Sequence, residues 1–429
     1  MGSQAETGRV LPSGVDRRNE RGRSSDAMRS APHAPKASII RTLDRGDRLV
    51  LAAVLLVSWT DLRLVFNLTV SDVLLFVYVI SNFGLLSREG RHRVGYSTVW
   101  AMLIIVPGVV VSILSSDYLA IELGIRAGIS IALPVLAMRY YFGIAAQHEV
   151  FVLKLRRLCR WFSYGSILWL AVTIQGSFPE ENIFRGRSGP TDHVTSAGIF
   201  LATCLVLGVC ELASGHGRFL HGGAVVIASI IGLGMNASRT ALVVFIPLFL
   251  LGLKLARGRL PKFGSRVLLG GMGVGLLVLF GKVRFTSLGG GLLARLNSSN
   301  SYSAGSSHER LLAFVQGWQE FLNSPLYGHG FRGSRLAHSV IVQILRTSGA
   351  IGGVGLAIVI ARIRGACQCL AARDSFPFGL LMLTVFLLVI PNTQAWDRFV
   401  WILPIAVLTV SHALGGRVHD VASTGTGES

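Results

Sequence analysis

Apolar runs of about 18 residues or more recur along most of this chain, and they limit the folds open to it. As a helix, each run is long enough to cross roughly 30 Å of hydrocarbon. The chain is 51% hydrophobic and 15% charged, whereas a soluble domain carries about 25% charged residues. A large soluble protein would need polar helix faces that these runs lack. The sequence therefore predicts an all-α fold, a polytopic bundle of transmembrane helices.

The apolar runs divide the chain into a membrane domain, 47–415, and two polar tails. Residues 1–46 are rich in Arg, Ser, Gly and Pro, which predicts a disordered basic tail, and residues 416–429 form a second tail. No cleavable signal peptide is expected, because the first apolar segment starts late. About twelve spans are predicted, near 48–65, 69–87, 95–114, 119–138, 161–176, 194–213, 222–236, 240–255, 266–283, 339–361, 377–391 and 399–413.

The formal charge of +19 is concentrated in loops between the apolar runs. This placement is typical of a topology signal rather than of a nucleic-acid-binding surface. With the N-terminus inside, basic stretches such as SREGRHR (87–93) and KLRRLCR (154–160) fall on the cytoplasmic side, together with about 28 of the 41 Lys and Arg residues. We therefore expect both termini in the cytoplasm and no nucleic-acid partner.

This topology places two notable loops outside, at 175–193 and 284–338. The second loop contains SSHERLLAFVQGWQEFLNSP, whose apolar residues recur at helical spacing. Ser306 and Glu309 form a capping-box pattern that predicts the helix start, and Pro325 predicts its end. The predicted helix is amphipathic and is expected to lie on the outer membrane–water boundary.

Arginines are retained on the predicted outer face, where the positive-inside rule depletes them. The guanidinium fork matches phosphate oxygens in two-point geometry, so a cluster of arginines at a membrane surface suits a polyprenyl-linked pyrophosphate. For any single arginine, headgroup contact or snorkelling at a helix end is the alternative. The outer-face arginines are Arg185, Arg187, Arg239, Arg295, Arg310, Arg332 and Arg335.

Histidines supply the titratable groups of the predicted outer face. His338 immediately precedes a long apolar span, and its imidazole titrates near neutral pH. A lone interfacial histidine is more often structural, but the neighbouring arginines favour a functional role here. His193, beside Asp192, is a second candidate for the same cavity. Arg126 within a span is explained by Glu122, one turn earlier. No acidic cluster on the outer face suits a divalent metal, so no metal is expected.

Four segments together resemble the motifs of one family, in order and with its spacing. His338-Ser339, nine further residues and Gly349-Ala-Ile-Gly352 resemble the His-(Asn/Ser/Gln)-x9-Gly-x-x-Gly signature of the O-antigen ligase superfamily. That superfamily also holds bacterial polysaccharide polymerases and protein O-glycosylation ligases. The second segment comprises Arg310, Trp318 and NSPLYGHG (323–330), which are similar to the family's Arg, Trp and Pro-Leu-x-Gly-x-Gly stretch. The third is NASRT (236–240), which is similar to its Ser-Arg-Thr. The fourth is GRSGPTDHVTSAGIF (186–200), which resembles the segment entering the preceding core span.

The resemblance covers about 185–365 and implies glycosyl transfer on the outer side of a bacterial inner membrane. The donor would be a glycan on undecaprenyl pyrophosphate, and the acceptor a hydroxyl of a lipid, another glycan or a protein. The family is regarded as inverting and metal-independent, so no cofactor is expected. By the same resemblance, Arg239 and Arg310 would hold the pyrophosphate and stabilise its leaving charge. His338 would orient or deprotonate the acceptor hydroxyl.

The resemblance leaves several points open. Gly349 and Gly352 would permit close helix packing. Ser339 stands where many ligases have Asn, so acceptor contacts can differ, and ligase and polymerase remain equally compatible with the sequence. A transporter or flippase of lipid-linked glycans is the alternative from another class, and it requires charged residues lining a path through several spans. A non-enzymatic scaffold is a third. The candidates for substrate binding are Arg185, Arg187, His193, Arg332, Arg335 and Trp318.

Overall fold

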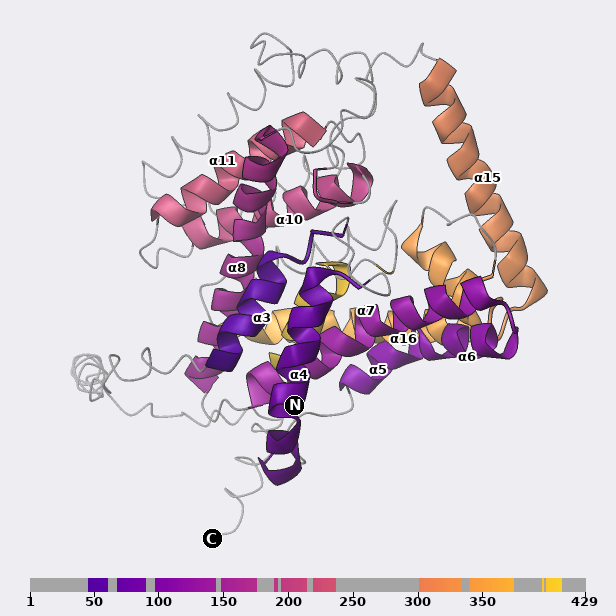
Figure 1. Ribbon diagram of the computed structural model, residues 1–429, viewed down its shortest axis with the longest axis horizontal. Helices are drawn as coiled ribbons and strands as arrows, with labels where there is room; N and C mark the ends of the chain where they lie inside the picture. Colours follow the sequence, from indigo (N-terminus) through magenta and orange to yellow (C-terminus); the bar gives the residue numbers. More distant parts are fainter. Residues whose placement is uncertain are drawn as a thin grey trace, which may run out of the picture. The chain divides into compact units, whose positions relative to one another are not determined.

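The regular structure of the described residues is helical throughout (Figure 1), which confirms the all-α prediction for that part of the chain. The computed structural model describes residues 45–60, 68–89, 97–143, 148–175, 189–191, 194–213, 219–236, 301–332, 339–373, 396 and 399–410. The helices are α3 (Arg45–Leu55), α4 (Val70–Glu89), α5 (Ser97–Leu103), α6 (Val106–Leu114), α7 (Tyr118–Gly143), α8 (His148–Ile174), α10 (Val194–Ala213), α11 (Phe219–Asn236), α15 (Ser301–Asn323) and α16 (Val340–Arg373). Residues 399–410 are also helical.

Several predictions fall outside the described residues. These are the C-terminal tail at 416–429, nearly all of the N-terminal tail at 1–46, most of the outer loop at 175–193, and the spans at 240–255, 266–283 and 377–391.

Three helical segments are long and apolar enough to cross a membrane: Tyr118–Phe142, Val194–Leu212 and Val340–Ala366. All three coincide with predicted spans. Shorter apolar helices accompany them, at Val70–Phe83, Trp100–Leu114, Leu220–Asn236 and Phe399–Val410. Large apolar side chains on these helices are exposed, among them Phe83, Leu114 and Leu220. Lipid-facing helices present apolar surface in this way, so the membrane assignment is supported.

Two groups of helices organise the packing of the described residues. In one, α8 contacts α3, α10 and α11, and in the other α16 contacts α5, α6 and α15. α7 contacts α4 and α6. Aromatic rings fill the first group: the Phe162 and Phe200 centroids lie 5.3 Å apart, and the Phe200 and Phe399 centroids lie 6.0 Å apart. Trp169 is fully buried on α8.

The span predicted at 95–114 is two helices, α5 and α6. Ile104 and Ile105 form a turn between the two helices, and Pro107 stands in the first turn of α6. Proline is favoured at the start of a helix because amides there need no partner within the helix, and its ring blocks the turn before it. The proline therefore accounts for the division.

α8 begins at His148, well before the predicted span at 161–176, so the basic stretch 154–160 is helical. Lys, Leu and Arg are good helix formers, which favours this extension. Lys154 fixes it in place: its Nζ lies 3.4 Å from the Asp47 carboxylate on α3 and donates to the Tyr141 carbonyl oxygen on α7 at 2.8 Å. A basic stretch expected in a loop thus joins three helices.

α15 is the helix predicted in the outer loop. It begins at Ser301, so the expectation that Ser306 and Glu309 mark its start was wrong. It ends at Asn323, shortly before Pro325, as predicted. Between His308 and Asn323, where burial is described, its buried residues are Ala313 and Gly317. A separate exposed apolar face consists of Leu311, Phe314, Val315, Trp318 and Leu322, and exposed polar residues include Gln316, Gln319 and Asn323.

The exposed apolar face of α15 is expected to lie in a lipid boundary. A benzophenone amino acid at Phe314 should then cross-link to acyl chains in a bilayer, because Phe314 belongs to this face. The same group at Gln316, across the helix from it, is the matched control and should give few lipid adducts. Mass spectrometry of the cross-linked peptides measures both yields. Equal yields would contradict the interfacial placement of the helix.

Candidate functional site

α16 is interrupted at Gly349, where φ is 63° and ψ is −159°. Residues with a Cβ atom rarely adopt a positive φ of this kind. A Cβ atom at this position would also overlap the Leu326 carbonyl group. The interruption takes two carbonyl groups before it and two amide groups after it out of the helical hydrogen-bond ladder. These four backbone groups need partners from another segment.

The loop 325–331 supplies the partners on the first side of the break. The amide of His329 donates to the Arg346 carbonyl oxygen at 2.7 Å, and the amide of Gly330 donates to the Thr347 carbonyl oxygen at 3.0 Å. The loop amides therefore cap the carbonyl end of the first half of α16.

The same loop supplies the partners on the second side. The amide of Ala350 donates to the Pro325 carbonyl oxygen at 2.7 Å, and the amide of Ile351 donates to the Leu326 carbonyl oxygen at 3.4 Å. All four groups released by the break are thus satisfied by one short loop. The loop and the broken helix form a single unit, which we call the α15–α16 junction (residues 320–332 and 346–351).

α6 closes the junction on another side. The amide of Phe331 donates to Ser112 Oγ at 2.8 Å, and Ser112 Oγ donates in turn to the Gly108 carbonyl oxygen at 2.8 Å. A Cβ atom on Gly330 would lie 2.6 Å from Ser112 Oγ. The glycine is therefore needed for the loop to approach α6 this closely.

The two glycines of the His-x-x9-Gly-x-x-Gly signature have different roles. Gly352 permits close packing, as predicted, because a Cβ atom there would lie 3.2 Å from the Ile104 carbonyl oxygen. Gly349 provides the positive φ at which the helix breaks. Gly349 also permits a close approach, but to the Leu326 carbonyl group of the loop and not to another helix, and its positive φ was not predicted.

An ion pair lies at the centre of the junction. Arg346 is only 4% exposed, and its guanidinium is paired with the Glu320 carboxylate on α15 through Nε. Its Nη2 donates to the Arg332 carbonyl oxygen at 2.7 Å. The Arg332 side chain is exposed and reaches the Ser115 carbonyl oxygen at 3.2 Å. In the described part of the chain, no group of three or more His, Cys, Asp or Glu residues could hold a metal ion.

The structure describes some of the predicted site residues, and others fall outside the described part of the chain. Arg332 belongs to the junction. Arg310 is half-buried on α15. Trp318 is on the exposed apolar face of the same helix, with its ring centroid 5.4 Å from that of Phe321. Outside the described residues are Arg185, Arg187, His193, Arg239, Arg335 and His338.

Comparisons of the chain with protein families, curated proteins and solved structures found no match. Function is therefore inferred from the residues and their geometry.

Three residues of the junction were missed in the sequence: Glu320, Arg346 and His329. Arg346 carried a usable signal, because an arginine within a predicted span is either paired or functional. Its partner Glu320 could not be found, since 26 positions separate the two in the chain. His329 stood within the NSPLYGHG stretch, where only the pattern of glycines and proline drew attention.

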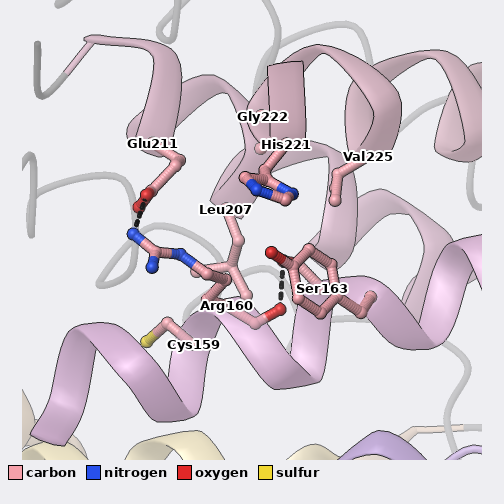
Figure 2. Close-up of a pocket in the computed structure, with 10 residues that line it drawn as sticks. Cys159, Arg160, Ser163, Leu207, Glu211, His221, Gly222 and Val225 are labelled. Atoms are coloured by element: carbon pink, nitrogen blue, oxygen red, sulfur yellow. Dashed lines mark hydrogen bonds and ion pairs between the residues drawn. The ribbon is translucent and has the colours of Figure 1, made fainter. Parts of the chain in front are cut away.

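A pocket that is partly open to solvent, with an empty volume of about 270 Å³, is lined by α8, α10 and α11 (Figure 2). Arg160 is paired with Glu211 across it, and Ser163 Oγ donates to the Arg160 carbonyl oxygen at 2.8 Å. The His221 and Tyr164 ring centroids lie 5.9 Å apart. Arg160 is the one arginine or lysine in the lining, and Glu211 neutralises it. We therefore assign the ion pair a structural role in joining α10 to α8.

Cys159 in this cavity lies before the predicted span at 161–176. Burial raises the pKa of its thiol to about 12, and the nearby Glu211 carboxylate adds to the effect. The thiolate is the nucleophilic form of cysteine, and it is scarce at neutral pH when the pKa is this high. The cavity therefore lacks an activated thiol.

Proposed function

We propose that this protein is a membrane glycosyltransferase that moves a glycan from undecaprenyl pyrophosphate to a hydroxyl acceptor, on the extracytoplasmic side of a bacterial inner membrane. One observation carries the proposal. The two segments on which the family resemblance chiefly depends, 323–330 and 338–352, are bonded to each other through four backbone hydrogen bonds at the α15–α16 junction. A shared position in one structural unit is what a common site would require of the two segments.

The surroundings of His338 also support the proposal. Before it in the chain, Arg332 is the last described residue, and its carbonyl oxygen accepts from Arg346 Nη2 at 2.7 Å. Just after it, the Ser339 carbonyl oxygen accepts from the Gln343 amide at 2.8 Å in the first turn of α16. The described residues that flank this segment, Arg332 and Ser339, are thus both held by hydrogen bonds. Backbone that is held in place before the substrate binds favours catalysis, because the side chains it carries need less ordering during the reaction.

The proposed reaction is a displacement at the anomeric carbon of the donor sugar. His338 accepts the proton of the acceptor hydroxyl as its oxygen attacks that carbon. The bond between the anomeric carbon and the pyrophosphate oxygen breaks, and undecaprenyl pyrophosphate leaves with the electron pair. Arg239, Arg310 and Arg332 stabilise the negative charge that develops on the leaving group. The exposed apolar face of α15 suits a donor that remains in the membrane by its polyprenyl chain.

The proposal is tested with purified protein, an undecaprenyl-pyrophosphate-linked glycan and a panel of lipid, glycan and protein acceptors. Wild-type protein is expected to transfer the glycan and release undecaprenyl pyrophosphate. His338→Ala should reduce the transfer rate about a hundredfold or more, the usual contribution of a general base. Arg310→Ala should also abolish most of the transfer.

Arg364→Ala is the matched control, because Arg364 is exposed on α16 beyond the junction. It should transfer at the wild-type rate. Unchanged activity in His338→Ala would contradict its role as the base. Movement of the glycan across vesicle membranes without transfer would instead favour a transporter. The acceptor that is used separates a ligase from a polymerase.

A further inference from the structure

Arg332 is an exposed cation at the end of the α15–α16 junction. Its guanidinium carries five N–H donors, and one of them, on Nη2, donates to the Ser115 carbonyl oxygen at 3.2 Å. Among the residues that the structure describes, no carboxylate forms an ion pair with it. The remaining donors and the full positive charge therefore face outward, where they suit the oxygens of a phosphate group.

The backbone of Arg332 is held from inside the junction by Arg346. The Arg346 side chain is nearly buried and uses two edges of its guanidinium for two partners. Its Nε is paired with the Glu320 carboxylate on α15, and its Nη2 donates to the Arg332 carbonyl oxygen at 2.7 Å. Because the guanidinium is planar and rigid, these two contacts fix the position of the Arg332 backbone relative to α15 and α16.

The Arg332 side chain is held by a turn between α6 and α7 (residues 115–117), which we call the α6–α7 turn. Ser116 has a φ of 57° and is the single non-glycine residue with a positive φ in the described part of the chain. The Ser115 hydroxyl donates to the Ser112 carbonyl oxygen at 2.6 Å, and the Asp117 amide donates to the Ser115 Oγ at 3.3 Å. The Asp117 carboxylate accepts from the Leu119 amide at 3.1 Å, as an N-cap of α7.

The strain at Ser116 has a consequence for the arginine. A non-glycine residue keeps a positive φ only where its surroundings impose that conformation, and such residues are frequent at binding sites. Here the hydrogen bonds of the α6–α7 turn fix the Ser115 carbonyl group, which receives the guanidinium. Arg332 is therefore held at both ends, at its backbone by Arg346 and at its side chain by the turn.

We infer that Arg332 is a preorganised pyrophosphate-binding residue, and that Arg346 is the positioning residue that holds it. This rests on the proposed function, in which Arg332 stabilises the leaving group. A long, flexible side chain normally loses conformational entropy when it binds a ligand. Arg332 has lost much of that freedom before the donor arrives, so more of its interaction with the phosphate appears as affinity.

A double-mutant cycle on donor affinity tests the inference, with full-length protein in detergent micelles and undecaprenyl pyrophosphate as the probe. Arg332→Gln should weaken binding by at least about tenfold, the usual consequence of losing a charged hydrogen bond. Arg346→Met keeps Arg332 but releases its backbone, and should weaken binding roughly two- to tenfold. In protein that already carries Arg332→Gln, Arg346→Met should cause no further loss, because it acts through Arg332.

Two variants and two further probes serve as controls. Arg364→Met removes an exposed arginine of α16 beyond the junction and should bind the donor as the wild type does. Thr203→Val removes a buried bond within α10, from Oγ1 to the Ile199 carbonyl oxygen at 2.9 Å. It should lower the thermal midpoint and leave donor affinity unchanged, which separates lost stability from lost positioning. Undecaprenol and phosphatidylglycerol should bind Arg332→Gln and wild-type protein equally.

The outcomes separate the inference from the function on which it rests. Wild-type donor affinity in Arg332→Gln, when the wild-type protein transfers glycan, overturns the inference and leaves the function intact. Additive losses in the cycle would make Arg346 purely structural and overturn its positioning role. An equal Arg332→Gln defect with phosphatidylglycerol would make Arg332 a general headgroup contact and also overturn the inference. Failure of the wild-type protein both to bind undecaprenyl pyrophosphate and to transfer glycan overturns the two together.

Arg346→Lys replaces Arg346→Met if the latter does not fold. Lysine keeps a positive charge for Glu320 but lacks the planar fork that reaches two partners at once. The same loss of donor affinity is expected, and again only in protein that retains Arg332. Wild-type affinity in Arg346→Lys would overturn the positioning role.

Discussion

Gly349→Ala is expected to destabilise the folded protein by more than about 3 kcal/mol, from backbone strain and lost hydrogen bonds together. Alanine is strained at a φ of 63°, and its Cβ atom would overlap the Leu326 carbonyl group. The loop must then withdraw, and the four hydrogen bonds that satisfy the broken helix weaken together. Equilibrium unfolding in mixed detergent micelles, followed by circular dichroism, measures the loss.

Gly365→Ala on the same helix is the matched control. A Cβ atom at Gly365 meets nothing within 4 Å, and the backbone there is helical. Alanine should therefore stabilise the protein slightly, by about 0.5–1 kcal/mol, through its better helix propensity. If both substitutions stabilise the protein, the break in α16 is not required by the fold.

Glu320→Ala is expected to cost about 3–5 kcal/mol of stability, because it leaves the Arg346 guanidinium buried without its counter-charge. The double substitution Glu320→Ala with Arg346→Met removes both charges and should recover a large part of this loss. Arg346→Met alone should cost less than Glu320→Ala, since the Glu320 side chain is 22% exposed and the Arg346 side chain only 5%. The same unfolding measurement gives all three values.

Glu309→Ala is the control for Glu320→Ala, because Glu309 is an exposed carboxylate on the same helix. It should change stability by less than about 0.5 kcal/mol, as is usual at a surface position. Equal effects at the two glutamates would mean that the pair with Arg346 contributes nothing. Additive losses in the double variant would show that the two charges are not coupled.

The helices predicted best are those that hydropathy alone defines. The span predicted at 194–213 matches α10 at both ends, because an uninterrupted apolar run meets polar residues on each side. The prediction failed where one residue changed the backbone locally. Pro107 divided a single predicted span, and Gly349 broke α16 without any change in hydropathy. Periodicity reports the burial of a segment and is insensitive to its dihedral angles.

Sequence alone could point to individual residues of the candidate site but not to the contacts between them. Arg332 drew attention because arginines should be scarce on an outer face, and it does lie at the junction. The pair between Glu320 and Arg346 joins two helices, and a single sequence holds no information on such a contact.

The α15–α16 junction also bears on how the chain folds. The hydrogen bonds between the loop and the broken helix join residues fewer than 30 positions apart, so the entropy lost in closing that segment is small. The bond from Phe331 to Ser112 spans 219 positions. Contacts of low sequence separation form fastest. The loop and both halves of α16 can therefore assemble as a local unit late in synthesis, and α6, made much earlier, then provides the surface on which this finished unit docks.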